Sequence, residues 1–383
     1  MEKKKLALPL CVIAAFTWFG YHCGAGFASG RQVWLYACRY GKAGIVVPFI
    51  AWICCATFMY IAAEYSRLKK AKNYRDIVSI YYDHPTVNRV ALLLWDILIF
   101  MASITASGSC VAGCGTLLNN LFGLPYFFGC LVFVVLMCAL LCLGQGILER
   151  LGRFGTALII VFFLICLIAI ASNFGRLGQV LTTDLSAPVE EISTGGLIWK
   201  AVTYGIVQIS FFQALSVMAG RFESRKQSVI FTLCGFLLNC GAMVAAFFAV
   251  MAYYPQIGES TMPMFTIVSG FGGALGGVLS IAYNCVLVLA YITTAGALVA
   301  GGQARYTPLL KKKISNETVC RLIITIVFLG GSSAMSTLGL DGILTTINTI
   351  NASCRLPIWF IPFLILGPIS IHKLSKKLRE KAQ

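Results

Sequence analysis

The sequence predicts an all-α polytopic membrane protein with about ten transmembrane helices. Of its 383 residues, 58% are hydrophobic and only 11% are charged, a composition that no class of soluble globular protein shares. Apolar runs long enough to cross a bilayer recur along the whole chain, and no polar stretch is long enough for a soluble domain. Residues 1–383 therefore form a single transmembrane domain. The predicted spans are 6–38, 43–66, 87–118, 125–145, 149–172, 196–220, 227–253, 268–300, 317–337 and 341–371.

The positive charge of the chain is distributed as in a membrane protein. The net charge of +16 could suggest a nucleic-acid partner, but 24 of the 30 Lys and Arg residues lie in the two tails or in every second loop. Cytoplasmic loops carry such an excess of Lys and Arg. We therefore expect both termini in the cytoplasm and no nucleic-acid partner. The other six cationic residues are Arg31, Arg39, Lys42, Arg176, Lys200 and Arg355.

The order of spans and loops predicts two halves of opposite orientation. The longest loop, 173–195, follows the fifth span and is expected outside the cell. Five spans precede it and five follow it, so the first half begins inside and the second begins outside. This is the arrangement of an inverted repeat, with residues 6–172 as the first unit and 196–371 as the second.

The first span contains a segment that disfavours a continuous helix. Residues 20–30, "GYHCGAGFASG", place several glycines inside an apolar run. Glycine lacks a side chain that stabilises a helix, and a membrane helix tolerates freed backbone groups only beside a cavity, water or a ligand. We therefore predict that helix 1 is discontinuous. Helix 6, 196–220, carries a weaker signal at Gly205, and we predict an interruption near residues 208–212.

These motifs resemble a known family of transporters. "GYHCGAG", the following "RYG", "VVPFIAW" and "EYSRL" in helix 2, and "LVLAYITTAG" at 287–296 resemble the LeuT-type fold of the amino acid/polyamine/cation and neurotransmitter–sodium symporter superfamily. "GAGFASGRQV" most closely resembles the YkvI-like family of bacterial membrane proteins. The resemblance implies a LeuT-type 5+5 inverted repeat in the bacterial cytoplasmic membrane.

The resemblance also implies a sodium site between the helix 1 break and helix 8. The matching positions are the carbonyls of Gly20, Cys23 and Ala290 and the hydroxyls of Thr293 and Thr294. Sodium is a hard cation that suits neutral oxygens, and the C-terminal end of a half-helix carries partial negative charge. Alternatively, the two threonines bond only to their own helix backbone.

A substrate site is predicted on the other side of the same break. The amides of Gly24, Ala25 and Gly26 would face an anion, which favours a small amino acid or a related carboxylate or zwitterion. Alternatively, these glycines only allow close helix packing. His22 could contact the substrate or carry a proton, or it could simply satisfy a carbonyl. The remaining predicted contacts are Ser107, Tyr204, Gln208, Ser210 and Phe211.

Three charged residues complete the predicted site. Arg31 and Asp341 lie near the outer ends of helices 1 and 10, where the resemblance implies an external gate. Each charge could instead reach water at the membrane interface. Asp96 is predicted to be a buried acid with a functional role, ahead of Glu64, which lies nearer the cytoplasm.

The leading hypothesis is a secondary active transporter, a sodium-coupled symporter, in which the bundle of helices 1, 2, 6 and 7 moves against the rest. The alternatives are a proton-coupled transporter or exchanger, and a ligand receptor on the same fold that does not transport. No HExxH, GxSG or phosphate-loop motif is present, so neither an enzyme nor an organic cofactor is expected. The expected partners are a small-molecule substrate, sodium and the lipid bilayer.

Overall fold

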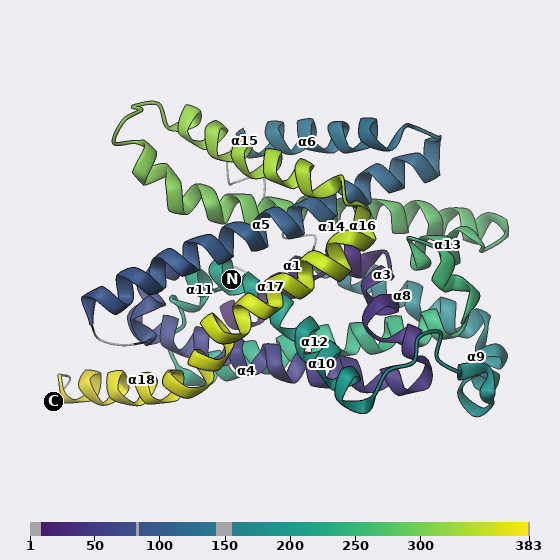
Figure 1. Cartoon of the computed structure of the whole chain (residues 1–383), viewed down its shortest axis with the longest axis horizontal. Helices are drawn as coiled ribbons and strands as arrows, with labels where there is room; N and C mark the ends of the chain where they lie inside the picture. Colours follow the sequence, from purple (N-terminus) through teal and green to yellow (C-terminus); the bar gives the residue numbers. More distant parts are fainter. Residues whose placement is uncertain (1–8, 82–83, 143–154, 382–383) are drawn as a thin grey trace, which may run out of the picture.

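The computed structural model describes residues 9–81, 84–142 and 155–381, and every regular element in this part of the chain is helical (Figure 1). Each predicted span coincides with a helix or a series of helices. In chain order these are α1 (Leu10–His22) with α2 (Ala25–Ala28) and α3 (Arg31–Tyr36), α4 (Val46–Lys69), α5 (Pro85–Phe122), α6 (Tyr126–Cys142), α8 (Gly155–Ser172), α10 (Thr194–Gln208) with η4 (Ile209–Phe211) and α11 (Phe212–Ala219), α12 (Arg225–Met251), α14 (Gly273–Leu310), α15 (Glu317–Ser336), and α16 (Gly339–Gly342) with η6 (Ile343–Ile347), α17 (Asn348–Arg355), η7 (Leu356–Phe360) and α18 (Ile361–Glu380).

Short helices lie in the connections between these spans. They are η1 (Cys38–Ile45), η2 (Tyr74–Ile80), α9 (Phe174–Thr182), η3 (Asp184–Ser186), η5 (Gln256–Glu259) and α13 (Pro263–Ser269). The predicted outer loop 173–195 thus contains helix, and it is tied to the start of helix 2 because the Val189 amide donates to the Arg39 carbonyl at 2.8 Å.

The apolar helices make the chain a multi-pass membrane protein. Among the described residues, seven helices are long and apolar enough to cross a bilayer, or eight if the pair Leu158–Ser172 and Phe174–Thr182, bent by 76°, is one span. Two shorter apolar helices, Leu10–His22 and Tyr126–Leu141, lie in the predicted spans 6–38 and 125–145. The count of ten and the cytoplasmic termini remain predictions, and the N-terminal tail and loop 143–154 lie outside the described residues.

The helices form two groups. In the first group α10, α11 and α12 pack on α4, and α1 packs on α12. In the second group α5, α6, α14 and α15 pack on one another. Figure 1 shows α6 and α15 together on one side of the molecule, away from α4 and α10. Helix α14 also contacts α1, α2 and α8, so it joins the two groups beside the helix 1 break.

Helix 1 is discontinuous, as predicted. The backbone leaves the helix at Cys23 (ψ 47°) and becomes extended at Gly24 (φ −80°, ψ −171°). It then turns again at Gly30, whose φ of 81° lies in the left-handed region that favours glycine. The carbonyl of Ser29 at this second turn accepts from the Met264 amide at 2.9 Å. The chain after the break therefore forms two short helices, α2 and α3, because the second turn separates them.

Helix 6 changes its winding but does not open. Residues Gln208–Phe212 all keep right-handed helical backbone angles, and only the turn Ile209–Phe211 is a 3₁₀ helix. The predicted interruption is thus a tightened turn at the expected place. Gly205 is not part of it. A Cβ at Gly205 would lie 2.4 Å from the Ala51 carbonyl oxygen, so this glycine allows α10 to pack closely on α4.

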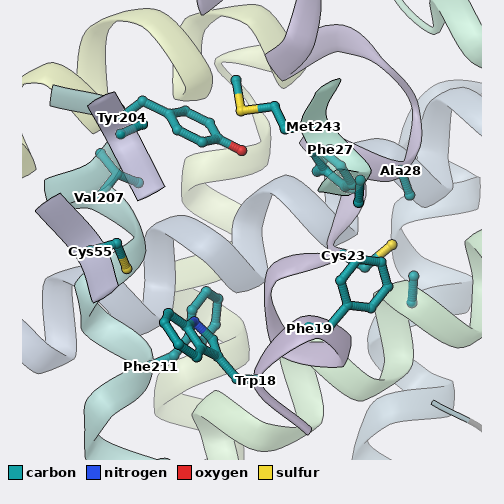
Figure 2. Close-up of a cluster of buried hydrophobic side chains, with 14 of the residues drawn as sticks. Trp18, Phe19, Cys23, Phe27, Ala28, Cys55, Tyr204, Val207, Phe211 and Met243 are labelled. Carbon is teal, nitrogen blue, oxygen red and sulfur yellow. The ribbon is translucent and has the colours of Figure 1, made fainter. Parts of the chain in front are cut away.

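Aromatic side chains fill the space around the two interrupted helices. Figure 2 shows Trp18, Phe19 and Phe27 of helix 1 in one cluster with Tyr204 and Phe211 of helix 6. All five side chains are buried. Helix 1 and helix 6 therefore meet at this aromatic cluster, beside the helix 1 break.

Candidate functional site

A small cavity lies at the helix 1 break, with a volume of about 40 Å³. This volume has room for a few water molecules and is smaller than that of most small-molecule pockets. Its walls come from helix 1, helix 3, helix 6, helix 8 and helix 10. The lining residues are Tyr21, His22, Gly24, Ala25, Gly26, Gln32, Ala102, Thr105, Ala106, Ser109, Val207, Gln208, Ser210, Phe211, Thr294, Ile343, Leu344, Asn348 and Arg355.

The predicted threonine pair of helix 8 makes two different kinds of contact. The Thr294 hydroxyl donates across to the Tyr21 carbonyl of helix 1 at 3.1 Å. The Thr293 hydroxyl contacts its own helix, at 2.9 Å from the Leu289 carbonyl and 3.2 Å from the Ala290 carbonyl. The prediction that helix 8 meets the helix 1 break is confirmed, and the carbonyl in direct contact is that of Tyr21.

The oxygens gathered here match the chemistry of a hard, singly charged cation. Two hydroxyls and the carbonyls of Tyr21 and Ala290 are neutral oxygen donors, which suit sodium. Cys23 is fully buried beside them, while an added Cβ at Gly20 would meet no atom within 4 Å. Gly20 and Cys23 remain proposed ligands.

The cavity contains all the predicted substrate contacts except Ser107 and Tyr204. Helix 3 lines it with Ala102, Thr105, Ala106 and Ser109, which recur at helical spacing on one face. Ser107 is buried on another face of α5, so the prediction that it contacts substrate is wrong about its direction. Periodicity alone gives the members of a face; it does not say which face meets the cavity.

His22 lies in the cavity wall and is held from behind by Tyr204. Its Nε2 atom is 2.7 Å from the Tyr204 hydroxyl, and its ring centroid lies 4.2 Å from that of Phe27 and 4.5 Å from that of Trp52. Nδ1 of His22 has no hydrogen-bond partner in the described chain. Tyr204 is therefore a positioning residue for His22, and no cavity contact of its own supports the predicted role in substrate binding.

Sequence reasoning missed Arg355 as a site residue. This arginine lies on α17 and lines the cavity together with Asn348. Its Nη1 donates to the Val207 carbonyl at 2.8 Å, at the end of α10 where helix 6 tightens. The available signal was an arginine inside a predicted span, because an ionisable residue at membrane depth is a functional candidate by default.

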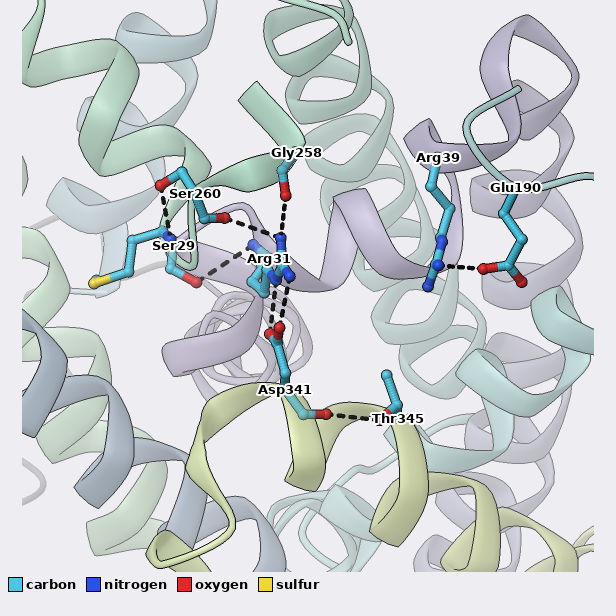
Figure 3. Close-up of polar contacts among 9 residues, drawn as sticks. Ser29, Arg31, Arg39, Glu190, Gly258, Ser260, Asp341 and Thr345 are labelled. Atoms are coloured by element: carbon cyan, nitrogen blue, oxygen red, sulfur yellow. Dashed lines mark hydrogen bonds and ion pairs between the residues drawn. The ribbon is translucent and has the colours of Figure 1, made fainter. Parts of the chain in front are cut away.

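The predicted pair Arg31 and Asp341 joins helix 1 to helix 10 (Figure 3). Arg31 Nε and Nη2 donate to the two carboxylate oxygens of Asp341 at 2.7 and 2.6 Å. Nη1 of Arg31 also donates to the carbonyls of Gly258 and Ser260 at 2.7 and 2.9 Å. The contact between helices 1 and 10 is confirmed, and it also includes the loop before α13. Its role as a gate remains a proposal.

A second ion pair joins helix 3 to helix 8. Arg305 of α14 donates to both oxygens of Asp96 of α5, at 3.1 and 2.7 Å, and the Tyr74 hydroxyl also donates to Asp96. Asp96 is partly exposed, with 17% of its side chain accessible, so the prediction of a buried acid is wrong for this residue. The buried acid is Glu64, which accepts from Arg67 and Ser228.

Comparison with known proteins identifies the fold. No family model matches the chain, and no curated protein matches it in sequence. Among solved structures, a Na⁺-coupled sialic acid symporter in a substrate-bound, outward-open state superposes with a TM-score of 0.67 at 11% identity over 93% of this chain and 78% of that one. The complex of MhsT with L-phenylalanine gives 0.59 at 14% identity over 98% and 99%.

A manganese transporter from Eremococcus coleocola gives a TM-score of 0.57 at 14% identity over 96% of this chain and 84% of that one. The chain has a LeuT-type fold. All three neighbours are transporters, and identities this low establish the fold alone. In this chain the fold places the helix 1 break, Thr294 and Arg355 around one cavity.

Proposed function

We propose that this chain is a secondary active transporter that moves a small carboxylate-bearing molecule across the bacterial cytoplasmic membrane, coupled to sodium. The observation that carries the proposal is the contact between the Thr294 hydroxyl and the Tyr21 carbonyl at the helix 1 break, in the wall of the central cavity. This contact joins the two helix groups at the point where freed backbone oxygens are available for an ion.

Sodium would be held by neutral oxygens of helices 1 and 8. The proposed ligands are the carbonyls of the break, from Gly20 to Cys23, with the Ala290 carbonyl and the hydroxyls of Thr293 and Thr294. Bound sodium supplies positive charge next to the substrate cavity, so sodium and an anionic substrate would favour each other's binding, and the coupling would be reciprocal.

Alternating access would open and close one end of the pathway at the Arg31–Asp341 pair, whereas the Asp96–Arg305 pair would hold the second group together. Arg31–Asp341 joins helix 1 to helix 10 on the outer side, and Asp96–Arg305 joins helix 3 to helix 8 on the inner side. The outer pair links helix 1 of the first group to helix 10, so movement of the first group would strain it. The inner pair lies within the second group and would move little. The inverted repeat, 6–172 and 196–371, supports such a movement, with both termini in the cytoplasm.

His22 favours one alternative, in which a proton replaces sodium. It lines the cavity and its Nδ1 has no partner in the described chain. A histidine can change protonation near neutral pH, so a proton-coupled transporter or exchanger would use this residue. A receptor on the same fold would bind the same ligand without moving it.

The test compares Thr294→Val with Thr307→Val in the purified, liposome-reconstituted chain. Both threonines are buried on α14, and about four helical turns separate them. We expect sodium to raise the thermal stability of the substrate-bound wild type. Thr294→Val should need at least about tenfold more sodium for the same effect, a loss of about 1.4 kcal/mol, while Thr307→Val should not.

Uptake driven by a sodium gradient separates the alternatives. Accumulation that follows the sodium gradient supports the proposal. Accumulation that follows a proton gradient and is lost in His22→Gln would show that protons, not sodium, are the coupling ion. Substrate binding without any uptake would make the chain a receptor.

A further inference from the structure

The central cavity contains a fixed positive charge from Arg355. This side chain is only 2% exposed and lies on α17 near the middle of the last long helix series. Arginine does not lose its proton in proteins. The charge is therefore present whenever the cavity is formed, at a depth where an uncompensated charge is unfavourable.

The contacts around Arg355 compensate this charge only in part. Nη1 donates to the Val207 carbonyl at 2.8 Å, and the guanidinium lies over the Trp359 ring at 5.7 Å from its centroid. Nε has no hydrogen-bond partner among the described residues. A carbonyl and an aromatic face attract a cation, but neither carries a full negative charge.

No acid of the described cavity wall neutralises Arg355. The lining residues within the described ranges contain no Asp or Glu. Three acids on membrane helices already have an arginine partner. Glu64 pairs with Arg67, Asp96 with Arg305 and Asp341 with Arg31. The cavity therefore carries net positive charge, and a buried cation left unpaired costs far more than one that meets a carboxylate.

We propose that the cargo is an organic anion with net negative charge, an organic acid or an acidic amino acid, whose carboxylate binds Arg355. This inference rests on the proposed function and names its substrate class. A zwitterion brings no net charge, so it would leave the arginine uncompensated, and a bound sodium would add a further positive charge. A net anion neutralises both, and the planar guanidinium is suited to a carboxylate.

The backbone of helix 10 positions this arginine. α17 lies between two π-helical turns, Ile343–Ile347 and Leu356–Phe360, and single π turns in membrane or soluble helices are frequent at functional sites. Asn348, seven residues before Arg355, faces the same cavity, as does Gln208 from helix 6. These neutral amides can bond the rest of the cargo without cancelling the charge that selects it.

The first experiment uses the wild-type chain in lipid nanodiscs with sodium and measures thermal stability against matched ligand pairs. Succinate is compared with succinamate and succinamide, glutamate with glutamine, and lactate with lactamide, with phenylalanine and putrescine as neutral and cationic members. We expect stabilisation by at least one carboxylate, with at least tenfold weaker binding of its amide analogue. Equal binding of both, binding of only neutral or cationic members, or no binding by any anion would overturn the inference.

The second experiment uses Arg355→Gln and Arg355→Lys with Arg225→Gln as control, since Arg225 is exposed at the cytoplasmic end of α12. We expect Arg355→Gln to lose the preference for carboxylate over amide, Arg355→Lys to keep part of it, and Arg225→Gln to match the wild type. If Arg355→Gln does not fold, the lysine variant and the wild-type ligand pairs still decide. An unchanged preference in Arg355→Lys and Arg355→Gln would overturn the inference.

Failure of the two proposals can be told apart. If anions bind through Arg355 but do not cross the liposome membrane, the inference about the ligand holds and the proposal of transport is wrong. If the wild type and Arg355→Gln both take up neutral or cationic cargo, the chain is a transporter but its cargo is not an organic anion.

Discussion

Helix 1 and helix 6 occupy equivalent places at the start of the two halves, yet only helix 1 opens. In helix 1 the backbone becomes extended at Gly24, whereas helix 6 only tightens into a 3₁₀ turn at Ile209–Phe211. Helix 1 contains several glycines in this segment, and its freed groups have partners in Thr294 and Met264. Helix 6 has a single glycine there, and packing against α4 uses it.

The difference shows that a glycine in a membrane helix has two opposite uses. It weakens the helix where neighbouring groups can satisfy the released backbone, and it strengthens packing where another backbone comes close. Helix 6 still frees one carbonyl at its tightened turn. That carbonyl, of Val207, accepts from Arg355 and from the Ser210 hydroxyl at 3.0 Å. Helix 1 therefore presents its Tyr21 carbonyl to Thr294, and helix 6 uses its Val207 carbonyl to hold an arginine.

The largest expected effect is at Gly205. Gly205→Ala places a Cβ against the Ala51 carbonyl oxygen, so α10 must move away from α4, at a cost of about 1–3 kcal/mol of stability. Gly195→Ala on the same helix is the control, because a Cβ there meets no atom within 4 Å. Thermal unfolding in detergent checks both. If Gly205→Ala is as stable as the wild type but binds ligand differently, Gly205 would instead belong to an interruption of helix 6.

A smaller effect on stability, with a clear effect on ion binding, is expected at Gly24. Its backbone angles are open to any residue, but a Cβ would lie 3.1 Å from Thr294 Cγ2 and 3.3 Å from Thr294 Oγ1. Gly24→Ala should therefore change stability by less than about 1 kcal/mol and weaken sodium-dependent stabilisation severalfold. Gly20→Ala, which keeps its carbonyl and meets no neighbour, should not. Equal sodium responses in the two variants would contradict this role for the break.

The smallest effect on stability is expected at the outer ion pair. The Asp341 side chain is 43% exposed, so solvent screening limits the loss in Asp341→Asn to about 1 kcal/mol or less. Release of bound substrate should nevertheless become faster, because helices 1 and 10 lose their bidentate contact. Stopped-flow displacement measures this rate. The control is Glu190→Gln, which changes the neighbouring Arg39–Glu190 pair (Figure 3). Equal release rates in the two variants would show that the Arg31–Asp341 pair is not a gate.

The sequence by itself determined the features that depend on local chemistry. Long apolar runs specify membrane helices, since backbone groups in lipid must be bonded within the segment. The dense glycines of residues 20–30 specify the break, whereas the pairing of Arg31 with Asp341 was predicted from the resemblance to the LeuT-type fold.

Only the tertiary structure decided which side of each helix meets the cavity. Thr105 and Ser109 face it and Ser107 does not, although all three lie in one helix. The role of Gly205 depends on a backbone far away in sequence, and so does the place of Arg355 against Val207. A helical repeat is a local property, but the rotation of a helix about its axis follows from the packing of its neighbours, which residue spacing along one helix does not contain.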